Sequence, residues 1–126
     1  MTLLLDTHIW LWFVRGDSAL PRAFDEAIRE PQNAVVLSVV SAWEVQIKTA
    51  IGKLHVGRPV DEFLDDAVLR FDMLDVSMRH IRALGALPLH HRDPFDRLIV
   101  AQALVEKVPI VGRDQSFDNY GVQRIW

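Results

Sequence analysis

Five carboxylates follow strand-like runs of the sequence or open helix-like ones: Asp6, Glu44, Asp93, Asp96 and Asp114. In an open parallel sheet, residues just past the strand ends share the carboxyl edge, where ligands usually bind. Carboxylates gathered at that edge repel one another unless protons or cations neutralise them. A hard divalent cation such as Mg²⁺ prefers oxygen ligands and would neutralise them well. The pattern therefore predicts metal-assisted phosphate chemistry.

Each acid also has a structural explanation that needs no ligand. Asp93 before Pro94 is the pattern of a helix N-cap followed by proline at the first helical position. Ser41 and Glu44 are spaced as a capping box, in which the glutamate reaches back to its own helix start. The remaining acids could cap turns or favour a helix N-terminus through its dipole. Taken singly, capping is the favoured interpretation of each acid.

The combination of the acids favours the metal site. Capping does not require several helix starts to converge on one edge of a sheet. Asp93 and Asp96 are three residues apart, so both can face the same side of a first helical turn. Asp6 follows the first predicted strand and Asp114 the last long one, so the set joins distant parts of the chain. Capping and metal binding are also compatible, since both occur at helix N-termini.

Alternating strand and helix patterns predict the elements that would position these acids. Short apolar or β-branched runs predict strands at residues 3–5, 34–38, 71–76 and 108–112, and a short edge strand at 122–126. Helices are predicted at 7–14, from Pro21, from Ser41 to Gly52, from Pro59, at 80–84 and from Pro94, with a loop at 85–92. This order predicts an α/β fold: one three-layer α/β/α domain over residues 1–126 with a central, mainly parallel sheet.

Bulk composition limits the class of protein. The chain has 126 residues, 50% of them hydrophobic and 25% charged, which is typical of one soluble globular domain. Cysteine is absent, so thiolate metal sites are excluded and a reducing cytoplasm fits. The N-terminus resembles neither a signal peptide nor a membrane span. A net charge of −3 argues mildly against a simple basic nucleic-acid binder, although bound metal ions would restore local attraction for phosphate.

The residues around the acids resemble a known family. The matching segments are Leu5–His8, Ser38–Val45 with Ile47-Lys48 and Gly52–Leu54, Arg92–Ala103, and Arg113-Asp114 with the ending Tyr120–Val122 and Ile125-Trp126. In this order, over essentially the whole chain, they closely resemble PIN-domain ribonucleases, and among these the VapC-type toxins of bacterial toxin–antitoxin pairs. The segment from Asp93 to Ala103 is the most specific part of the resemblance.

The resemblance implies a central parallel sheet between helices, a homodimer, and Mg²⁺- or Mn²⁺-dependent endonucleolytic cleavage of RNA. Matched by motif, the catalytic and metal-binding acids would be Asp6, Glu44, Asp96 and Asp114. Asp93 occupies a neighbouring auxiliary position, and Thr7 matches a small hydroxyl residue that helps hold water or phosphate. Asp118 competes for the fourth place, but Asp114 is preferred because it lies nearer the strand end.

Other polar residues near the acids have two interpretations each. His90 and His91 could touch RNA phosphate or stack on a base, but an exposed loop pair is the favoured interpretation. Arg92 and Arg97 flank the acids and could hold substrate phosphate, or they could pair with nearby carboxylates in solvent.

Two features of the helices are interpreted structurally. Lys48 follows Glu44 by four residues, which favours ordinary helix stabilisation. Trp10, Trp12 and Phe13 lie so close together that they are not expected to face one small core from a single short helix. Burial and an interface with a second subunit or an antitoxin are therefore equally favoured.

The sequence thus predicts a PIN-type endoribonuclease, the toxin of a type II pair, cleaving single-stranded or loop RNA in the cytoplasm and blocked by a small antitoxin. One rival is a phospho-receiver-like signalling module with Mg²⁺ in an acidic pocket. That class needs a lysine after a late strand, whereas Gly112 is followed here by Arg113 and Asp114. The other rival is a catalytically dead PIN-type interaction domain.

Overall fold

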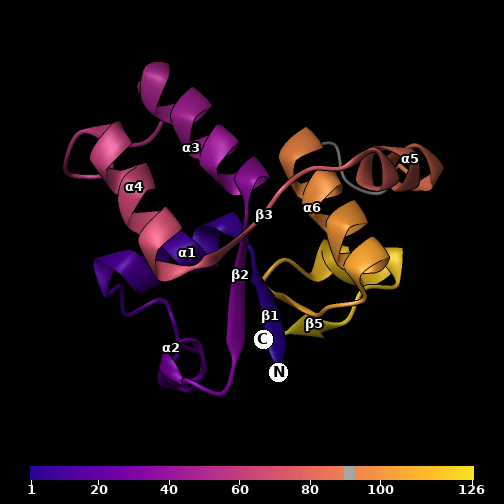
Figure 1. Ribbon diagram of the computed structural model, residues 1–126, viewed down its shortest axis with the longest axis horizontal. Coiled ribbons are helices and arrows are strands. Elements are labelled where there is room, and N and C mark those ends of the chain that lie inside the picture. Colours follow the sequence, from indigo (N-terminus) through magenta and orange to yellow (C-terminus); the bar gives the residue numbers. More distant parts are fainter. Residues whose placement is uncertain (90–92) are drawn as a thin grey trace.

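A parallel β-sheet runs through the middle of the molecule (Figure 1). Residues 1–89 and 93–126, which this computed structural model describes, contain five strands in the order β3-β2-β1-β4-β5. They are β1 (Thr2–Leu5), β2 (Ala34–Ser38), β3 (Asp72–Leu74), β4 (Ile110–Val111) and β5 (Arg124–Ile125). Each pair of neighbouring strands is parallel, which confirms the predicted α/β fold and makes the sheet parallel throughout the described residues.

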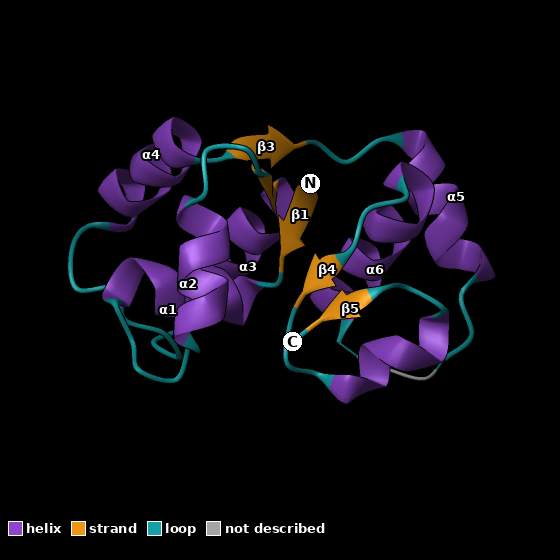
Figure 2. Ribbon diagram, turned by 90° about the horizontal axis from the view of Figure 1, so that it is seen from below, coloured by secondary structure: helices purple, strands orange, loops and turns teal. Residues whose placement is uncertain are grey.

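Helices cover both faces of the sheet. They are α1 (Thr7–Arg15), α2 (Arg22–Arg29), α3 (Val39–Ala50), α4 (Val60–Arg70), α5 (Met78–Ala86) and α6 (Pro94–Glu106), followed by the 3₁₀ helix η1 (Gln115–Tyr120). Helices α1, α2 and α4 lie on one side, and α5 and α6 on the other (Figures 1 and 2). The three-layer arrangement is therefore as predicted. Over the described residues, no helix has both the length and the apolar surface needed to cross a lipid bilayer.

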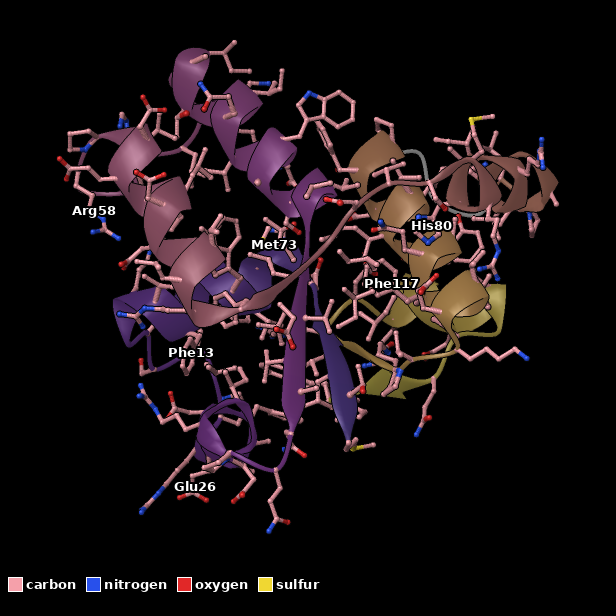
Figure 3. The ribbon with its side chains drawn as sticks, viewed as in Figure 1. Phe13, Glu26, Arg58, Met73, His80 and Phe117 are labelled. Carbon is pink, nitrogen blue, oxygen red and sulfur yellow. The ribbon has the colours of Figure 1, made fainter. Side chains whose placement is uncertain are left out.

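Side chains alternate along the strands and build one core on each face. Leu3 and Leu5 of β1 belong to the cluster under α1, α2 and α4, whereas Leu4 between them belongs to the cluster under α6 and η1. This alternation follows from the two-residue period of a strand. Figure 3 shows Phe13 and Met73 on the first side and Phe117 on the second. Both faces of the sheet are apolar because both are buried.

The aromatic residues of α1 are packed inside the protein. Trp10 is 1% exposed and Phe13 is 7% exposed, while the partly buried Trp12 packs against the same cluster. The ring centroids are 5.1 Å apart for Trp10 and Phe63 and 6.2 Å apart for Phe13 and Phe71. The expectation that these side chains cannot share one core is wrong. The core extends from the sheet around α1 to α4, so successive directions around α1 meet apolar partners.

Helix α3 begins earlier than predicted. Ser38, the last residue of β2, is its N-cap, and the Oγ of Ser38 accepts a hydrogen bond from the backbone N–H of Val40 at 3.0 Å. Ser41 lies inside the helix and is fully buried. The predicted capping box of Ser41 and Glu44 is therefore wrong, because the strand runs into the helix three residues before it. The Glu44 side chain therefore does not cap its own helix.

The segment around β3 and α5 also differs in extent. The predicted strand at 71–76 is observed only over Asp72–Leu74, and the helix predicted at 80–84 extends over Met78–Ala86. Ser77 starts this helix with a capping box, because its Oγ accepts from the N–H of His80 while the ring Nδ1 of His80 accepts from the N–H of Ser77. Histidine takes the place that glutamate usually has in this motif.

The register of the sheet brings three chain segments to one edge. Leu5 of β1 pairs with Leu37 on one side and with Val111 on the other. The three strands therefore end within a residue of one another at the carboxyl edge of the sheet. The backbone N–H of Asp6 donates to the carbonyl oxygen of Val111 at 2.9 Å, which continues the ladder by one residue.

Gly112 allows the backbone of β4 to pass close to Asp6. A Cβ atom at Gly112 would lie 3.2 Å from the Cβ of Asp6 and 3.3 Å from an edge carbon of the buried Phe117 ring. Contacts this short require the neighbours to move, and both neighbours are held by the core or by the site. The glycine therefore sets the spacing between β4 and the start of α1.

We expect Gly112→Ala to destabilise the fold by about 1–2 kcal/mol through overpacking. Equilibrium denaturant unfolding measures the change. The matched control is Gly85→Ala in α5, where a Cβ meets nothing within 4 Å. That change should stabilise by a few tenths of a kcal/mol or up to about 1, because alanine favours helix. Equal stability of the two variants would contradict the steric role of Gly112.

Candidate active site

Three of the predicted acids line one pocket at the carboxyl edge of the sheet. This pocket, called the acidic pocket below, has a volume of about 240 Å³ and is lined by Asp6, His8, Trp12, Asp96, Arg113 and Asp114. Asp6 comes from the junction of β1 and α1, Asp96 from the first turn of α6, and Asp114 from the segment after β4. Acids far apart in the sequence thus share a single cavity.

The backbone holds two of these acids in place. The Oδ1 atom of Asp6, a residue 4% exposed, accepts a hydrogen bond from the N–H of Thr7 at 2.9 Å and caps α1. The Oδ1 atom of Asp114 accepts from the N–H and the Oγ–H of Ser116 at 2.9 and 2.7 Å and caps η1. Capping and clustering therefore occur together at these positions.

Asp93 has the predicted capping geometry. Its Oδ1 accepts hydrogen bonds from the N–H groups of Phe95 at 2.8 Å and Asp96 at 3.2 Å, and Pro94 follows at the first helical position. Asp93 does not line the acidic pocket. By fixing the first turn of α6, it holds the backbone that carries Asp96.

Glu44 lies beside the acidic pocket and is connected to it by Thr7. The Glu44 side chain is buried, and its Oε1 accepts a hydrogen bond from the hydroxyl of Thr7 at 2.9 Å. The same hydroxyl oxygen lies 2.8 Å from the Oγ of Ser41. Because a threonine hydroxyl carries one proton, Ser41 is the donor in that second contact. Thr7, the residue after Asp6, therefore joins the start of α1 to the middle of α3.

Lys48 is the cationic partner of Glu44. Its ammonium group forms the predicted i,i+4 ion pair with Oε2 of Glu44, but Glu44 is only 3% exposed, so the pair is more than a surface contact. Partial burial lowers the pKa of Lys48, yet the hydrogen bond and charge of Glu44 and the charges of Asp93 and Asp96 raise it overall. Lys48 therefore stays protonated and compensates a buried carboxylate.

His8 lies in the electrostatic field of the same acids. Its Nδ1 lies 3.7 Å from Oδ2 of Asp6. This close approach to the Asp6 carboxylate is the main cause that raises the pKa of His8; burial opposes it, and the charges of Asp6, Glu44 and Asp96 reinforce it. His8 and Lys48 both respond to Glu44 and Asp96, so one negative field spans the acidic pocket and the Glu44 side chain.

Asp118, the competitor for the fourth acidic position, faces elsewhere. Its two carboxylate oxygens accept hydrogen bonds from Nε and Nη2 of Arg124 at 2.9 and 3.0 Å. This bidentate contact lowers the pKa of Asp118. Asp118 does not line the acidic pocket, whereas Asp114 does.

The flanking basic residues are only partly described. His90, His91 and Arg92 lie outside the described residues, so both interpretations of them remain predictions. The Nη1 of Arg97 donates to the carbonyl oxygen of Pro88 at 3.0 Å, a contact with the backbone that neither interpretation of Arg97 anticipated.

Sequence reasoning missed His8 and Arg113 and gave Ser41 the wrong role. His8 follows Asp6 by two residues in the first turn of α1, and Arg113 directly precedes Asp114, so both were available as neighbours of predicted site acids. Their proximity could have signalled that the pocket walls carry positive as well as negative groups. Ser41 was identified, but as a cap. Its true contact with Thr7 spans 34 residues of sequence, which local patterns cannot reveal.

The donor set has the chemistry that Mg²⁺ or Mn²⁺ prefers. The carboxylates of Asp6, Asp96 and Asp114 border one cavity, and hard oxygen donors of this kind suit such ions. Within residues 1–89 and 93–126, no three Asp, Glu or His side chains are already close enough to share one ion. The residues thus fit the class of ion, and binding would draw the carboxylates together.

Comparison with known proteins identifies the family but gives no close relative. The PIN domain family model matches residues 3–123. No curated protein matches the sequence.

Solved structures with the same fold cover almost the whole chain. The chain in VapBC2 from Rickettsia felis, bound to a DNA fragment from its promoter, has a TM-score of 0.74 and 17% identity, covering 99% of this chain and 98% of that one. The chain in VapBC-1 from nontypeable Haemophilus influenzae has a TM-score of 0.73 and 17% identity, covering 99% and 97%. FitAcB from Neisseria gonorrhoeae gives 0.67 and 17%, covering 98% and 96%.

At these identities the solved structures show a shared fold, while the family model extends over nearly all of the sequence. The parallel sheet, the acids at its carboxyl edge and the match over residues 3–123 agree with one another. This chain belongs to the PIN domain family.

Proposed function

We propose that this chain is a metal-dependent endoribonuclease that cleaves single-stranded or loop RNA as the toxin of a type II toxin–antitoxin pair. The observation that supports this most is the convergence of Asp6, Asp96 and Asp114 on one pocket, with Glu44 tied to its edge through Thr7. PIN domain proteins are generally nucleases, and the resemblance to VapC-type toxins adds the toxin role. The substrate, the metal and the site residues are part of the proposal.

The acids would act together as the ion-binding groups of the site. The proposed metal ligands and catalytic residues are Asp6, Glu44, Asp96 and Asp114. When bound, Mg²⁺ or Mn²⁺ would supply positive charge for the phosphate and make a nearby water more acidic. The side chains hold negative charge that an RNA phosphate cannot approach without such a cation. No covalent nucleophile from the protein is required.

Two residues would support the acids without contacting the scissile bond. Thr7 donates to Glu44 and accepts from Ser41, so it fixes the direction of one Glu44 oxygen toward α1. Asp93 caps α6 and thereby orients the turn that bears Asp96. Both roles are auxiliary: they set the positions of charged oxygens and leave the chemistry to those oxygens.

The proposed protein partners are an antitoxin and a second copy of this chain. VapBC2 and VapBC-1, named above, and a toxin–antitoxin complex from Klebsiella pneumoniae (TM-score 0.60, 20% identity) are toxin–antitoxin structures. For the homodimer, α3 and its C-cap residue offer an apolar ridge in which Trp43, Ile47 and Ile51 are 51%, 41% and 58% exposed at four-residue spacing. Such a ridge is unusual on a monomer surface.

We assign the protein to the cytoplasm.

The rival functions have different standing. Membership of the PIN domain family disfavours the phospho-receiver-like module. A catalytically dead PIN-type interaction domain has the same fold, and only the activity of the acids distinguishes it from the enzyme. The next three experiments address that difference.

Metal-linked stability is the first expected outcome. Because clustered carboxylates repel one another in the metal-free fold, saturating Mn²⁺ or Mg²⁺ should raise the melting temperature; at 100 times Kd, selective binding to the native state is worth about 2.7 kcal/mol. Asp6→Asn should weaken this response. If neither ion changes the melting temperature of the wild type and calorimetry also detects no binding, the metal site is ruled out.

Glu44→Gln separates structure from catalysis. Glutamine keeps an oxygen to accept from Thr7, so the fold should persist, while the lost charge should lower metal-dependent RNA cleavage by about 100-fold, as expected for removal of one electrostatic group from a site. Asp93→Asn keeps the N-cap and should lose less. Cleavage rates are compared at matched folded fraction over a range of Mn²⁺. Full activity of Glu44→Gln at low Mn²⁺ would remove Glu44 from the site.

Growth of a bacterial host tests the toxin role. Expression of the chain alone should arrest growth, and Asp96→Asn should restore growth at an equal protein level. Asp118→Asn is the matched control, because it changes an acid outside the acidic pocket and should remain toxic. Harmless high-level expression of the folded wild type would count against the toxin role, with RNA cleavage in vitro deciding whether the host simply lacks the target.

A further inference from the structure

A second pocket adjoins the acidic pocket on the side of α3. It has a volume of about 190 Å³ and lies among α1, the middle and second half of α3, and the segment after α3. His8 and Trp12 line both cavities, so the two share a wall. Its lining includes three cationic side chains, Arg15, Lys48 and Lys53, and one carboxylate, that of Glu44. Lys48 compensates this carboxylate, so the pocket keeps an excess of positive charge. We call it the basic pocket.

The three cations differ in whether a carboxylate of the protein already neutralises them. Lys48 is paired with Glu44. Arg15 is exposed and makes a long contact of 3.4 Å from Nη2 to the carbonyl oxygen of His55, which balances no charge. In the part of the chain that the structure describes, the exposed ammonium group of Lys53 has no hydrogen-bond or ion-pair partner. Arg15 and Lys53 therefore offer positive charge to a ligand.

The position of these charges indicates an anion that continues from the acidic pocket. The protein carries a net charge of −3, and its acids repel a polyanion except where cations compensate them. A single-stranded RNA whose cleaved phosphate lies at the acidic pocket carries another phosphate on each side of it. The wall between the pockets includes the indole of Trp12, which gives bases and sugars an apolar surface.

We propose that the basic pocket binds a phosphate of the RNA strand next to the cleaved linkage, with Arg15 and Lys53 as its principal contacts. This inference rests on the proposed function and adds the place where the substrate backbone is held. It assigns Arg15 and Lys53 to substrate binding, so their loss should raise KM far more than it lowers kcat. An acidic segment of a protein partner is the competing occupant.

Equilibrium binding tests the proposal without cleavage. A fluorescently labelled single-stranded RNA is titrated with the protein at low salt, once in EDTA and once in Ca²⁺. Arg15→Ala and Lys53→Ala should each weaken binding about 3- to 10-fold and lower the slope of log K against log salt by about 0.7 per lost phosphate contact. Arg79→Ala, which removes an exposed cation on α5, is the control and should change neither.

The phosphate is located with RNAs that carry one uncharged methylphosphonate linkage, moved along the strand. At one position near the cleavage site, the modification should weaken wild-type binding as much as the double alanine variant does, and it should have no added effect on that variant. Equal, additive losses at every position would overturn the inference. So would unchanged RNA affinity of both variants, and so would failure of wild type to bind RNA in either buffer.

Two further outcomes distinguish RNA binding in the basic pocket from the proposed nuclease activity and from binding of an acidic protein segment. If wild type binds RNA through the basic pocket but cleaves nothing with Mn²⁺ or Mg²⁺, the proposed function fails while the binding site stands. If poly-glutamate binds wild type, loses affinity in both variants, and RNA affinity is unchanged, the pocket serves an acidic protein segment and the inference is overturned.

Discussion

The pairing of β1 with two neighbours at once determines where Asp6, Glu44 and Asp114 lie. Leu5 is in register with Leu37 and Val111, and the next residue, Asp6, still donates its N–H to Val111. This double pairing places the ends of β1, β2 and β4 at one edge, and the helices that follow start there. The cores on both faces then hold the register, because a slip of one residue would turn every apolar side chain of β1 to the other face.

The cost of that arrangement is crowding of like charges, and the protein offsets it with local donors. Asp6 and Asp114 accept backbone N–H groups at helix starts, Glu44 accepts from Thr7, and Lys48 neutralises its second oxygen. Each donor stabilises the ionised carboxylate. These contacts offset part of the crowding of carboxylates in a partly buried place, which a cation site requires. The same caps that explain each acid singly make the cluster possible.

Local sequence patterns predicted what depends on neighbours in the chain. Asp93 and Pro94 start α6 as expected, and the apolar runs lie in the strands. Prediction failed where a distant group decides the role. Ser41 resembled a cap because its spacing to Glu44 is that of a capping box. In the structure Ser38 caps α3, and the side chains of Ser41 and Glu44 both form hydrogen bonds with the hydroxyl of Thr7. The burial of the α1 aromatics likewise required α4, whose position no local pattern gives.

The direct passage from β2 into α3 leaves the Glu44 side of the site without a hinge. Ser38 is both the last strand residue and the helix cap, so no loop residue can change its backbone angles to swing α3. The hydroxyl of Ser38 also donates to the side-chain amide oxygen of the buried Gln102, which ties the start of α3 to α6. Any adjustment of Glu44 to a ligand must therefore come from rotation about its side-chain bonds, against a backbone that stays fixed.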